Sequence, residues 1–446
     1  FFTFQHKFHI TLEITGFHHI FESFSMHKRL AFIIVCTTRP DTPVPNFGFE
    51  RAALPKFKWF GGHYVIVRID QNGLRPRRNH LFPIHDRVAF GLHHNRLIGP
   101  GGKQEMLGMQ YANSETPTID LNGETYTIEL VTSDNGSSSD KAPSAASDLV
   151  AKGVSLVLGT YGSSAAMAGG PKFGEAGIAA IGVTCTNPNV TAGNDYYFRI
   201  CFLDNFQADV LANFAMDKFQ AKTAYCLGEN GNEYDQGLIS FFTKVFEGAG
   251  GKVITDSFPT NNSDFTTYLN KAKSEGADVI FTPVSIAYAT QIIQQASSLG
   301  ITIPFVGSDT LDDNMVLAAA QGTDVKLYVS TFYQEGGSPE FDAGIKAYIN
   351  GNATAKEANG GNDTISAVTA MGYDAYYVAL EAIKAAGSGD GAAIKAALPS
   401  VTYTGVSGAI SFDSIGDAVR DTAFIKTADT ANGVWALETV QTGSSN

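Results

Sequence analysis

The chain has 446 residues, a formal net charge of −13, 44% hydrophobic residues and 17% charged residues. This length suits two or three domains, and no apolar run reaches the roughly 18 residues that a membrane-spanning helix needs. The four cysteines follow neither a zinc-site spacing nor a disulfide framework. We therefore expect no metal and no cofactor.

The net charge hides an abrupt change in composition near Gly99. Residues 1–98 hold all ten histidines and nine of the eleven arginines. They carry 13 basic (Lys, Arg) and 6 acidic (Asp, Glu) side chains, whereas residues 99–446 carry 18 and 38. We predict an atypical N-terminal region over residues 1–98 and an acidic main body after it. The acidic body disfavours nucleic acid as a partner, because phosphates attract basic surfaces.

The N-terminal region lacks a regular alternation of strands and helices. Two candidate strands, His63–Asp70 and Arg87–Leu92, are separated by pieces rich in Arg and Pro. The segment Met26–Cys36 resembles the start of a lipoprotein signal peptide, with basic residues, an apolar stretch and then a cysteine. We expect residues 1 to about 85 to be irregular and non-native, as would follow from translation out of frame or from a miscalled start.

From Thr125 onward, apolar runs that suit strands alternate with segments that suit helices, and glycines close many of the loops. The predicted strands are Tyr126–Val131, Val154–Leu158, Ile178–Val183, Thr223–Leu227, Val253–Phe258, Val279–Pro283, Pro304–Val306 and Val325–Thr331. The predicted helices are Pro143–Ala151, a segment after Ser164, Gln236–Ala249, Phe265–Glu275, Ala287–Leu299, Pro339–Ile349, Ile365–Ala386 and Ala392–Ala397. This alternation predicts an α/β fold with parallel sheets covered on both faces. The number of units favours two similar lobes with a cleft between them.

Two of the predicted strands end in small hydroxyl residues. The strand that ends at Leu158 is followed by Ser163 and Ser164, and the next strand is followed by Thr184 and Thr186. In open parallel sheets, ligands bind outside the carboxyl ends of strands, where helix N-termini offer N–H groups. A serine at a helix start can be an ordinary N-cap, but two such clusters on adjacent strand ends favour an anion site.

Two more residues are candidates for ligand contact. Asp309 lies just past another strand end, where it could cap a loop or bind a ligand ammonium. Tyr234 opens a predicted helix and could serve packing or binding. The arrangement contains no nucleophile–base pair, because no histidine follows His94 and a Ser-His-Asp triad is therefore impossible in the main body. No dinucleotide or P-loop motif follows a strand there either. The sequence indicates a binding protein rather than an enzyme.

Metal and nucleic-acid sites are also disfavoured in the N-terminal region. The histidine pairs His18-His19 and His93-His94 lack a second pair at helical spacing and a carboxylate partner. The basic run Arg75–Arg78 has no interleaved aromatic residues.

From about Gly99 to Val440 the order of several motifs resembles one known family. The motifs are Asp134-Asn-Gly, Pro143-Ser-Ala-Ala, Val157-Leu-Gly-Thr-Tyr-Gly-Ser-Ser, Thr184-Cys-Thr-Asn-Pro, Phe198-Arg-Ile, Asn262-Ser-Asp-Phe, Gly307-Ser-Asp and Met371-Gly-Tyr-Asp-Ala-Tyr. The chain resembles substrate-binding proteins of ABC importers, of the leucine/isoleucine/valine-binding type with the type I periplasmic binding fold. The ordered set carries this resemblance, and residues 1–98 do not share it.

The resemblance implies two Rossmann-like lobes joined by three crossovers. Lobe 1 would contain residues 99–204 and 333–420, lobe 2 residues 205–332 and 421–446, and residues 88–92 could supply the first strand of lobe 1. The lobes would close on an amino acid or similar zwitterionic solute. The protein would be a monomer, periplasmic or lipid-anchored at the cell surface, and would deliver its solute to the importer's permease. The alternative is a ligand-sensing domain of a signalling receptor with the same fold.

The resemblance also assigns residues to the site. The positions carried over are Ser163, Ser164, Thr184, Thr186, Tyr234, Ser285 and Asp309. Ser163, Ser164 and Thr186 would hold the ligand carboxylate, Thr184 and Asp309 the ammonium, and the other two would contribute from lobe 2. Where relatives often place an aromatic residue after Pro283, this chain has Val284-Ser-Ile-Ala. That departure disfavours a large apolar ligand.

Overall fold

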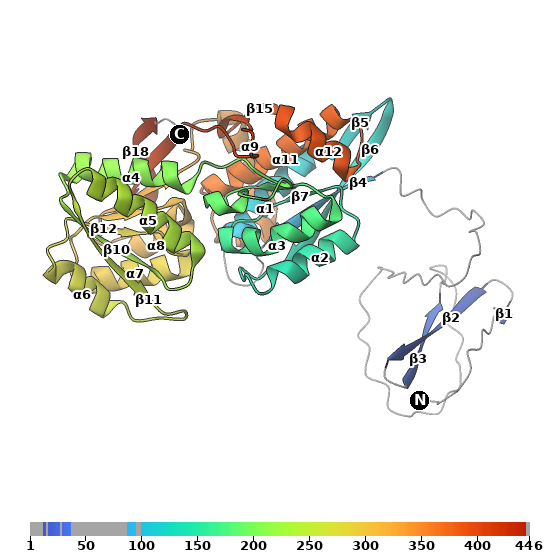
Figure 1. Ribbon diagram of the computed structural model, residues 1–446, viewed down its shortest axis with the longest axis horizontal. Helices are drawn as coiled ribbons and strands as arrows, with labels where there is room; N and C mark the ends of the chain where they lie inside the picture. Colours follow the sequence, from blue (N-terminus) through green and yellow to red (C-terminus); the bar gives the residue numbers. More distant parts are fainter. Residues whose placement is uncertain (1–11, 15–16, 27–28, 37–86, 95–99, 443–446) are drawn as a thin grey trace. The chain divides into compact units, whose positions relative to one another are not determined.

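The chain divides into two units, Phe1–Asn79 and His80–Asn446. A computed structural model describes residues 12–14, 17–26, 29–36, 87–94 and 100–442 (Figure 1). The second unit begins before the predicted boundary at Gly99, because a strand within residues 87–94 pairs with two strands of the main body. No helix in the described part of the chain is long and apolar enough to cross a membrane.

The described residues of the first unit form an antiparallel sheet. It has the order β1 (Leu12–Ile14), β2 (Phe17–Met26) and β3 (Arg29–Cys36). This corrects the expectation of an irregular chain for these residues, since most of the segment that resembles a signal peptide is strand β3. Both long strands are rich in aromatic and β-branched residues, which favour extended backbone. The predicted strand His63–Asp70 lies outside the described residues.

Lobe 1 is the body built on a six-stranded sheet of the second unit, with the order β5-β6-β4-β7-β8-β9. Strand β4 lies between β6 and β7 and is parallel to both, over the residues where the sequence suggests a first strand. Only β5 runs antiparallel to its neighbour. The strands are β4 (Arg87–His94), β5 (Thr118–Leu121), β6 (Glu124–Asp134), β7 (Leu156–Leu158), β8 (Ala180–Gly182) and β9 (Tyr197–Arg199).

Helices and a small hairpin complete lobe 1. The helices are α1 (Pro100–Glu115), α2 (Ala142–Ala151), α3 (Ser163–Ala176), α9 (Pro339–Gly351), α10 (Ala353–Ala358), α11 (Ala367–Ala386) and α12 (Gly391–Ala397). Two short 3₁₀ helices, Pro188–Val190 and Leu398–Ser400, and the hairpin of β15 (Thr402–Gly405) and β16 (Gly408–Ser411) lie in its loops.

Helices α1 and α11 approach each other closely, and glycine makes this possible. A Cβ atom on Gly108 of α1 would lie 2.0 Å from the carbonyl oxygen of Thr369. A Cβ atom on Gly372 of α11 would lie 2.0 Å from the carbonyl oxygen of Glu105. Such distances exclude any side chain at either position, so the two glycines fix where α1 can place Glu105.

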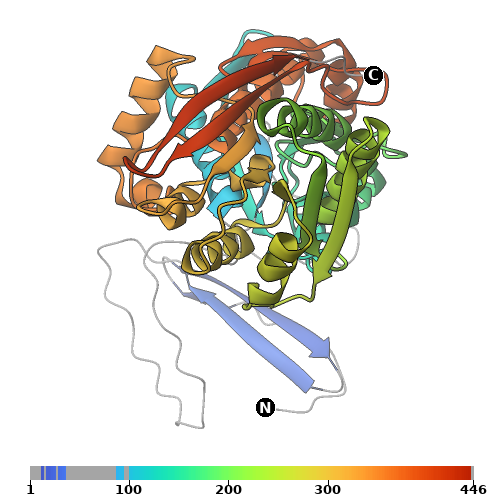
Figure 2. The ribbon, with the colours of Figure 1, turned by 90° about the vertical axis from the view of Figure 1, so that its left-hand side faces the viewer.

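Lobe 2 is built on a seven-stranded sheet with the order β11-β10-β12-β13-β14-β17-β18. The first five strands are parallel, and β17 and β18 add an antiparallel pair at one edge, which Figure 2 shows in red. The strands are β10 (Thr223–Glu229), β11 (Lys252–Phe258), β12 (Val279–Thr282), β13 (Phe305–Gly307), β14 (Leu327–Thr331), β17 (Thr422–Asp429) and β18 (Val434–Thr442). The helices are α4 (Asp204–Phe219), α5 (Glu233–Gly248), α6 (Thr266–Ser274), α7 (Ile286–Ser298), α8 (Asn314–Ala320) and the 3₁₀ helix Asp309–Leu311.

The chain passes between the two lobes three times, between β9 and α4, between β14 and α9, and between β16 and β17, because α9, α10 and α11 pack on α1 of lobe 1. The central strands are fully buried, as the runs Leu156–Leu158 and Val279–Thr282 illustrate. Continuous burial is typical of parallel strands that are covered on both faces. The predicted α/β fold class with parallel sheets is confirmed.

Candidate functional site

The loop after β7 leads directly into helix α3. The helix begins at Ser163, and its N-cap is Gly162, which has extended backbone and no side-chain cap. Ser163 is therefore the first helical residue and not the N-cap that the sequence suggests. Its hydroxyl oxygen accepts the backbone N–H of Asn187 at 3.2 Å, while Ser164 is half-buried. The first turn of α3 thus has no capping side chain, which leaves an anion-attracting helix end at this point.

The loop after β8 carries the other two hydroxyl residues of lobe 1. The hydroxyl of Thr184 donates to the Oε1 atom of Glu105 on α1. Thr186 is fully buried, and its hydroxyl lies next to the buried carboxyl group of Asp204 without a hydrogen bond of good geometry. The next residue, Asn187, donates from its side chain to the carbonyl oxygen of Glu233 in lobe 2 at 3.1 Å. One loop therefore carries a buried hydroxyl without a good hydrogen bond and a bond between the lobes.

Lobe 2 contributes a carboxyl group, that of Asp309, which follows β13 at the start of the 3₁₀ helix. Asp309 is buried, and its Oδ1 atom accepts hydrogen bonds from the side-chain amide of Gln207 at 2.6 Å and from the hydroxyl of Tyr234 at 2.7 Å. Burial raises the pKa of Asp309 to about 6, although both donors act in the opposite direction. The group is mostly ionised at neutral pH.

The donors to Asp309 are placed by two helices. Tyr234 is in the first turn of α5, where the side chain of Asn232 caps the N–H groups of Tyr234 and Asp235. Gln207 is in the first turn of α4 and also donates to the hydroxyl of Ser330 at 2.9 Å. Two of the predicted residues, Tyr234 and Asp309, are thus joined by a hydrogen bond. Gln207 was not among the predicted residues.

The described contacts do not bring Ser285 into this cluster. Ser285 is the N-cap of α7 without a side-chain cap bond, and it is exposed. The hydroxyl of Thr310 does reach the loop before it, donating to the carbonyl oxygen of Val284 at 3.0 Å. The loop after β12 therefore contacts the residue next to Asp309, and it does so through a backbone carbonyl group and not through the side chain of Ser285.

A second carboxyl group, that of Glu105, adjoins these residues through its bond with Thr184, and it was not among the predicted site residues. It is buried on α1, six residues after the predicted boundary at Gly99. Its pKa is raised to about 8, mainly by burial and also by the charge of Asp309, while the bond from Thr184 acts in the opposite direction. The neighbouring residue Gln104 donates to the Oδ2 atom of Asp313 in lobe 2 at 3.0 Å. The signal in the sequence was an acidic residue near the start of the helix that follows the first strand.

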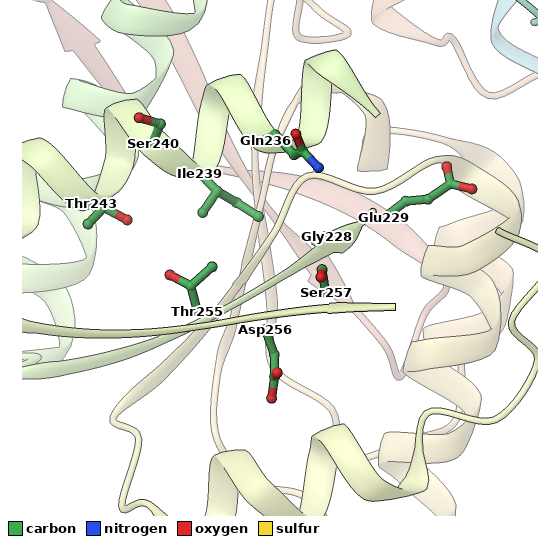
Figure 3. Close-up of a pocket in the computed structure, with 9 residues that line it drawn as sticks. All are labelled: Gly228, Glu229, Gln236, Ile239, Ser240, Thr243, Thr255, Asp256 and Ser257. Atoms are coloured by element: carbon green, nitrogen blue, oxygen red, sulfur yellow. The ribbon is translucent and has the colours of Figure 1, made fainter. Parts of the chain in front are cut away.

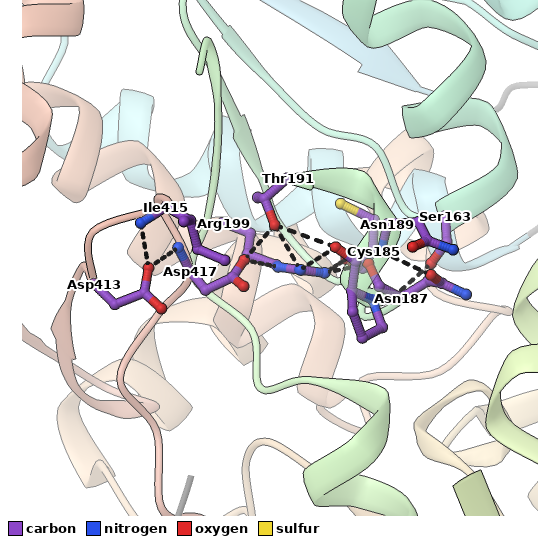
Figure 4. A network of polar contacts seen from close by, with 10 residues as sticks. Ser163, Cys185, Asn187, Asn189, Thr191, Arg199, Asp413, Ile415 and Asp417 are labelled. Atoms are coloured by element: carbon purple, nitrogen blue, oxygen red, sulfur yellow. Dashed lines mark hydrogen bonds and ion pairs between the residues drawn. The ribbon is translucent and has the colours of Figure 1, made fainter. Parts of the chain in front are cut away.

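A buried arginine holds the loop that carries Thr184 and Thr186 (Figure 4). Arg199 on β9 forms an ion pair with Asp417, whose Oδ1 atom lies 2.5 Å from its Nε atom. One terminal nitrogen, Nη1, donates to the carbonyl oxygens of Cys185 at 3.0 Å and Asn187 at 2.6 Å. The other, Nη2, donates to the hydroxyl of Thr191 at 2.9 Å. Arg199 therefore positions the backbone of the binding loop.

A separate groove of about 370 Å³ lies on lobe 2 between α5 and the strands β10 and β11 (Figure 3). Its two carboxylates have protein partners: Asp256 contacts Tyr225 and Lys271, and Glu229 accepts from Tyr288. The groove contains none of the predicted site residues. Its lining residues are Gly228, Glu229, Gln236, Ile239, Ser240, Thr243, Thr255, Asp256 and Ser257.

Known proteins resemble this chain over the main body. The sequence model of the family described as periplasmic binding protein matches residues 106–432. The leucine-, isoleucine-, valine-, threonine- and alanine-binding protein of Pseudomonas aeruginosa is 25% identical over 295 residues, which cover 65% of this chain and 76% of that protein. The Leu/Ile/Val-binding protein homolog 1 of Brucella abortus is 28% identical over 301 residues, which cover 67% and 77%.

Solved structures give the same result. The leucine-binding protein LivK of Thermotoga maritima superposes with a TM-score of 0.70 and 28% identity, covering 80% of this chain and 99% of that chain. The branched-chain amino acid binding protein LivJ of Streptococcus pneumoniae, in complex with isoleucine, gives a TM-score of 0.69 and 25% identity over 80% and 99%. A solute-binding protein of R. palustris in complex with benzoate shares the fold at 20% identity and a TM-score of 0.67, over 80% and 97%. The chain therefore belongs to the periplasmic binding protein family and has the type I fold of its Leu/Ile/Val-binding members.

Proposed function

We propose that the protein is an extracytoplasmic receptor that binds an amino acid or a similar zwitterionic solute between its lobes and delivers it to the permease of an ABC importer. Its role is binding and not catalysis. The observation that carries this proposal is a pair of complementary features. Lobe 1 offers the uncapped N-terminus of α3, which attracts anions, and lobe 2 offers the buried carboxylate of Asp309. The names of the relatives support the solute class, since they include proteins that bind branched-chain and small amino acids.

The ligand carboxylate is assigned to lobe 1. The first turn of α3 has no side-chain cap, so its N–H groups and the helix dipole favour a negative group. The buried hydroxyl of Thr186 has only a poorly aligned neighbour, the carboxyl group of Asp204, and a buried hydroxyl without a good hydrogen bond is costly. A ligand carboxylate would satisfy both features, with Ser163 and Ser164 as neighbours in the same turn.

The ligand ammonium is assigned to Asp309 of lobe 2. Two neutral donors, Gln207 and Tyr234, bind one oxygen of its carboxylate and fix its orientation. Neutral donors leave the negative charge without a counter-charge, which an ammonium group would supply. The solute-binding protein in complex with benzoate, an acid without an ammonium group, resembles this chain in fold only.

A panel of ligands tests this assignment by isothermal titration calorimetry. Each amino acid is compared with the carboxylic acid that lacks its ammonium group and with the amine that lacks its carboxylate. We expect the intact amino acid to bind, and each truncated analogue to bind at least about 30-fold more weakly, because each leaves a buried polar group unpaired. If benzoate or a des-amino acid binds as tightly as the best amino acid, the zwitterionic class is wrong.

A further inference from the structure

The proposed site holds two carboxyl groups, one from each lobe, and neutral groups bind both. Within the part of the chain that the structure describes, Glu105 accepts hydrogen bonds from Thr184, through its hydroxyl and backbone N–H. Asp309 receives side-chain hydrogen bonds from Gln207 and Tyr234. The two carboxyl groups interact electrostatically, since the charge of Asp309 raises the pKa of Glu105. An arrangement of this kind lacks positive charge.

The cations of the surrounding structure already have anionic or carbonyl partners. Lys426 is 2.9 Å from Asp312, and both side chains are buried. Arg199 pairs with Asp417. Arg420 donates to the carbonyl oxygen of Ile200 and, at 2.8 Å, to that of Ser407. Among the described residues, no Lys or Arg is recorded in a salt bridge with Glu105 or Asp309.

A third buried carboxyl group adds to this excess of acidic groups over basic groups. Asp204, at the start of α4, is fully buried, and neither of its oxygens has a hydrogen-bond partner of good geometry. Its pKa is raised to about 8, mainly by burial and also by the charge of Asp309, while the hydroxyl of Thr186 and the charge of Arg199 act in the opposite direction. Buried carboxylates without counter-charges are unfavourable unless they take up protons or a cation.

We propose that the ligand is an amino acid with a cationic side chain, and that Glu105 recognises the second positive charge. This inference rests on the proposed function. The charges are then complementary: the α3 end takes the ligand carboxylate, Asp309 takes one cationic group, and Glu105 takes the other. The absence of an aromatic residue after Pro283 agrees with a ligand that is not large and apolar. Glu105 is thus the residue that sets specificity.

Binding of such a ligand would be coupled to proton release. Because the pKa of Glu105 is about 8, the group is protonated in roughly nine of ten ligand-free molecules at pH 7. The titratable groups that interact with it are Asp309, Tyr161, Cys185 and Tyr197, from four different segments, and all of them are acids. A cation beside Glu105 would favour the ionised form, so its proton would pass to the buffer and affinity would rise with pH up to about 8.

Calorimetric titrations with L-lysine and L-norleucine test the inference, since norleucine has a chain of the same length without the charge. We expect the wild type to bind lysine at least about tenfold more tightly than norleucine. At pH 7, titration in buffers with different ionisation enthalpies should show release of about one proton on binding of lysine and much less with norleucine. Glu105→Gln should remove the preference and the proton release, while the matched control Glu175→Gln, an exposed residue of lobe 1, should retain both.

The outcomes separate the two proposals. If leucine or norleucine binds more tightly than lysine, or if affinity for lysine is unchanged in Glu105→Gln, the inference is wrong and the receptor function stands. If binding of lysine at pH 7 takes up protons, Glu105 acts as a neutral donor, and the inference is wrong as well. If no amino acid binds, the proposed function itself fails. The proton count in the wild type decides the question even if Glu105→Gln does not fold.

Discussion

The two halves of the candidate site are built in different ways. In lobe 1, hydroxyl residues directly follow β7 and β8, and a buried arginine fixes the loop that carries them. In lobe 2, Gln207, Tyr234 and Asp309 come together from two α-helices and a 3₁₀ helix, and the first and the last are 102 positions apart in the sequence. The lobe 1 half therefore depends on the geometry of a loop, whereas the lobe 2 half depends on one charge. Substitutions in the two lobes should therefore differ in how much they change stability and how much they change ligand binding.

The largest effect is expected from Arg199→Gln. The substitution leaves Asp417 buried without its counter-charge, and removing one partner of a buried pair lowers the free energy of unfolding by about 3–5 kcal/mol. Urea unfolding measures this change. The control is Lys172→Gln, which breaks an exposed pair with Glu175 and should change the stability by about 0–1 kcal/mol. Equal effects of the two substitutions would mean that the lobe 1 loop is held by other contacts.

Asp309→Asn should act on binding and much less on stability. The variant keeps the shape of the side chain and removes the charge opposite the ligand ammonium, so binding should weaken by about 2–5 kcal/mol. Calorimetry with the best amino acid measures the loss. Asp256→Asn, in the groove of the same lobe, is the control and should bind like the wild type. Unchanged affinity of Asp309→Asn would contradict the assignment of the ammonium.

Glu105→Gln should change how stability depends on pH. The pKa of Glu105 is about 8 in the folded protein against 4.5 for the free group, so the folded state keeps a proton that the unfolded state releases. Its contribution to stability is full below about pH 4.5 and is lost as the pH rises through 8. Without ligand, the free energy of unfolding of the variant should exceed that of the wild type by roughly 2–4 kcal/mol at pH 8.5 and should equal it at pH 4.5. Parallel stability curves of the two proteins would contradict the raised pKa.

The smallest effect is expected from Thr186→Val. The hydroxyl of Thr186 is buried beside the carboxyl group of Asp204 without a hydrogen bond of good geometry, so its removal should change the free energy of unfolding by less than about 1 kcal/mol. Ligand affinity should fall by about 1 kcal/mol, because the carboxylate loses one donor. Thermal unfolding and calorimetry measure the two quantities. A clear loss of stability would show that the hydroxyl serves the fold and not the ligand.

Much of the fold could be predicted because its elements are local patterns. The strands that end at Leu158 and Thr282 are short apolar runs, and glycines mark the ends of several helices. Helix α1 was not predicted: it begins with Pro100-Gly-Gly, and it packs through glycines and not through a clear apolar face. The antiparallel pair β17 and β18 was missed as well, because the alternation of strands and helices ends before it.

The site was predictable only where its residues are close in sequence. Ser163 and Thr186 follow neighbouring strands, and the topology alone places both strand ends at one edge of the sheet. The partnership of Asp309 with Gln207 depends on how α4 packs in lobe 2, which no local pattern contains. Glu105 is buried in the site because α1 packs closely on α11, so its role follows from tertiary structure. The position of Ser285 within the site remains a prediction.

The hydrogen bonds between the lobes bear on how fast a solute could leave. Asn187 donates to a backbone carbonyl oxygen of lobe 2, a bond of about 1 kcal/mol, and Gln104 donates to a carboxyl group, a bond of about 1.5–3 kcal/mol. Both donors lie beside residues assigned to the ligand, Thr186 and Glu105. Opening the lobes would break these bonds and loosen the ligand's contacts in the same step. Asn314 of lobe 2 also donates to the carbonyl oxygens of Asn359 and Thr364 of lobe 1. The residence time of the solute would then depend on a small set of bonds between the lobes, part of them beside the site, which suits a carrier that has to release its cargo on every cycle.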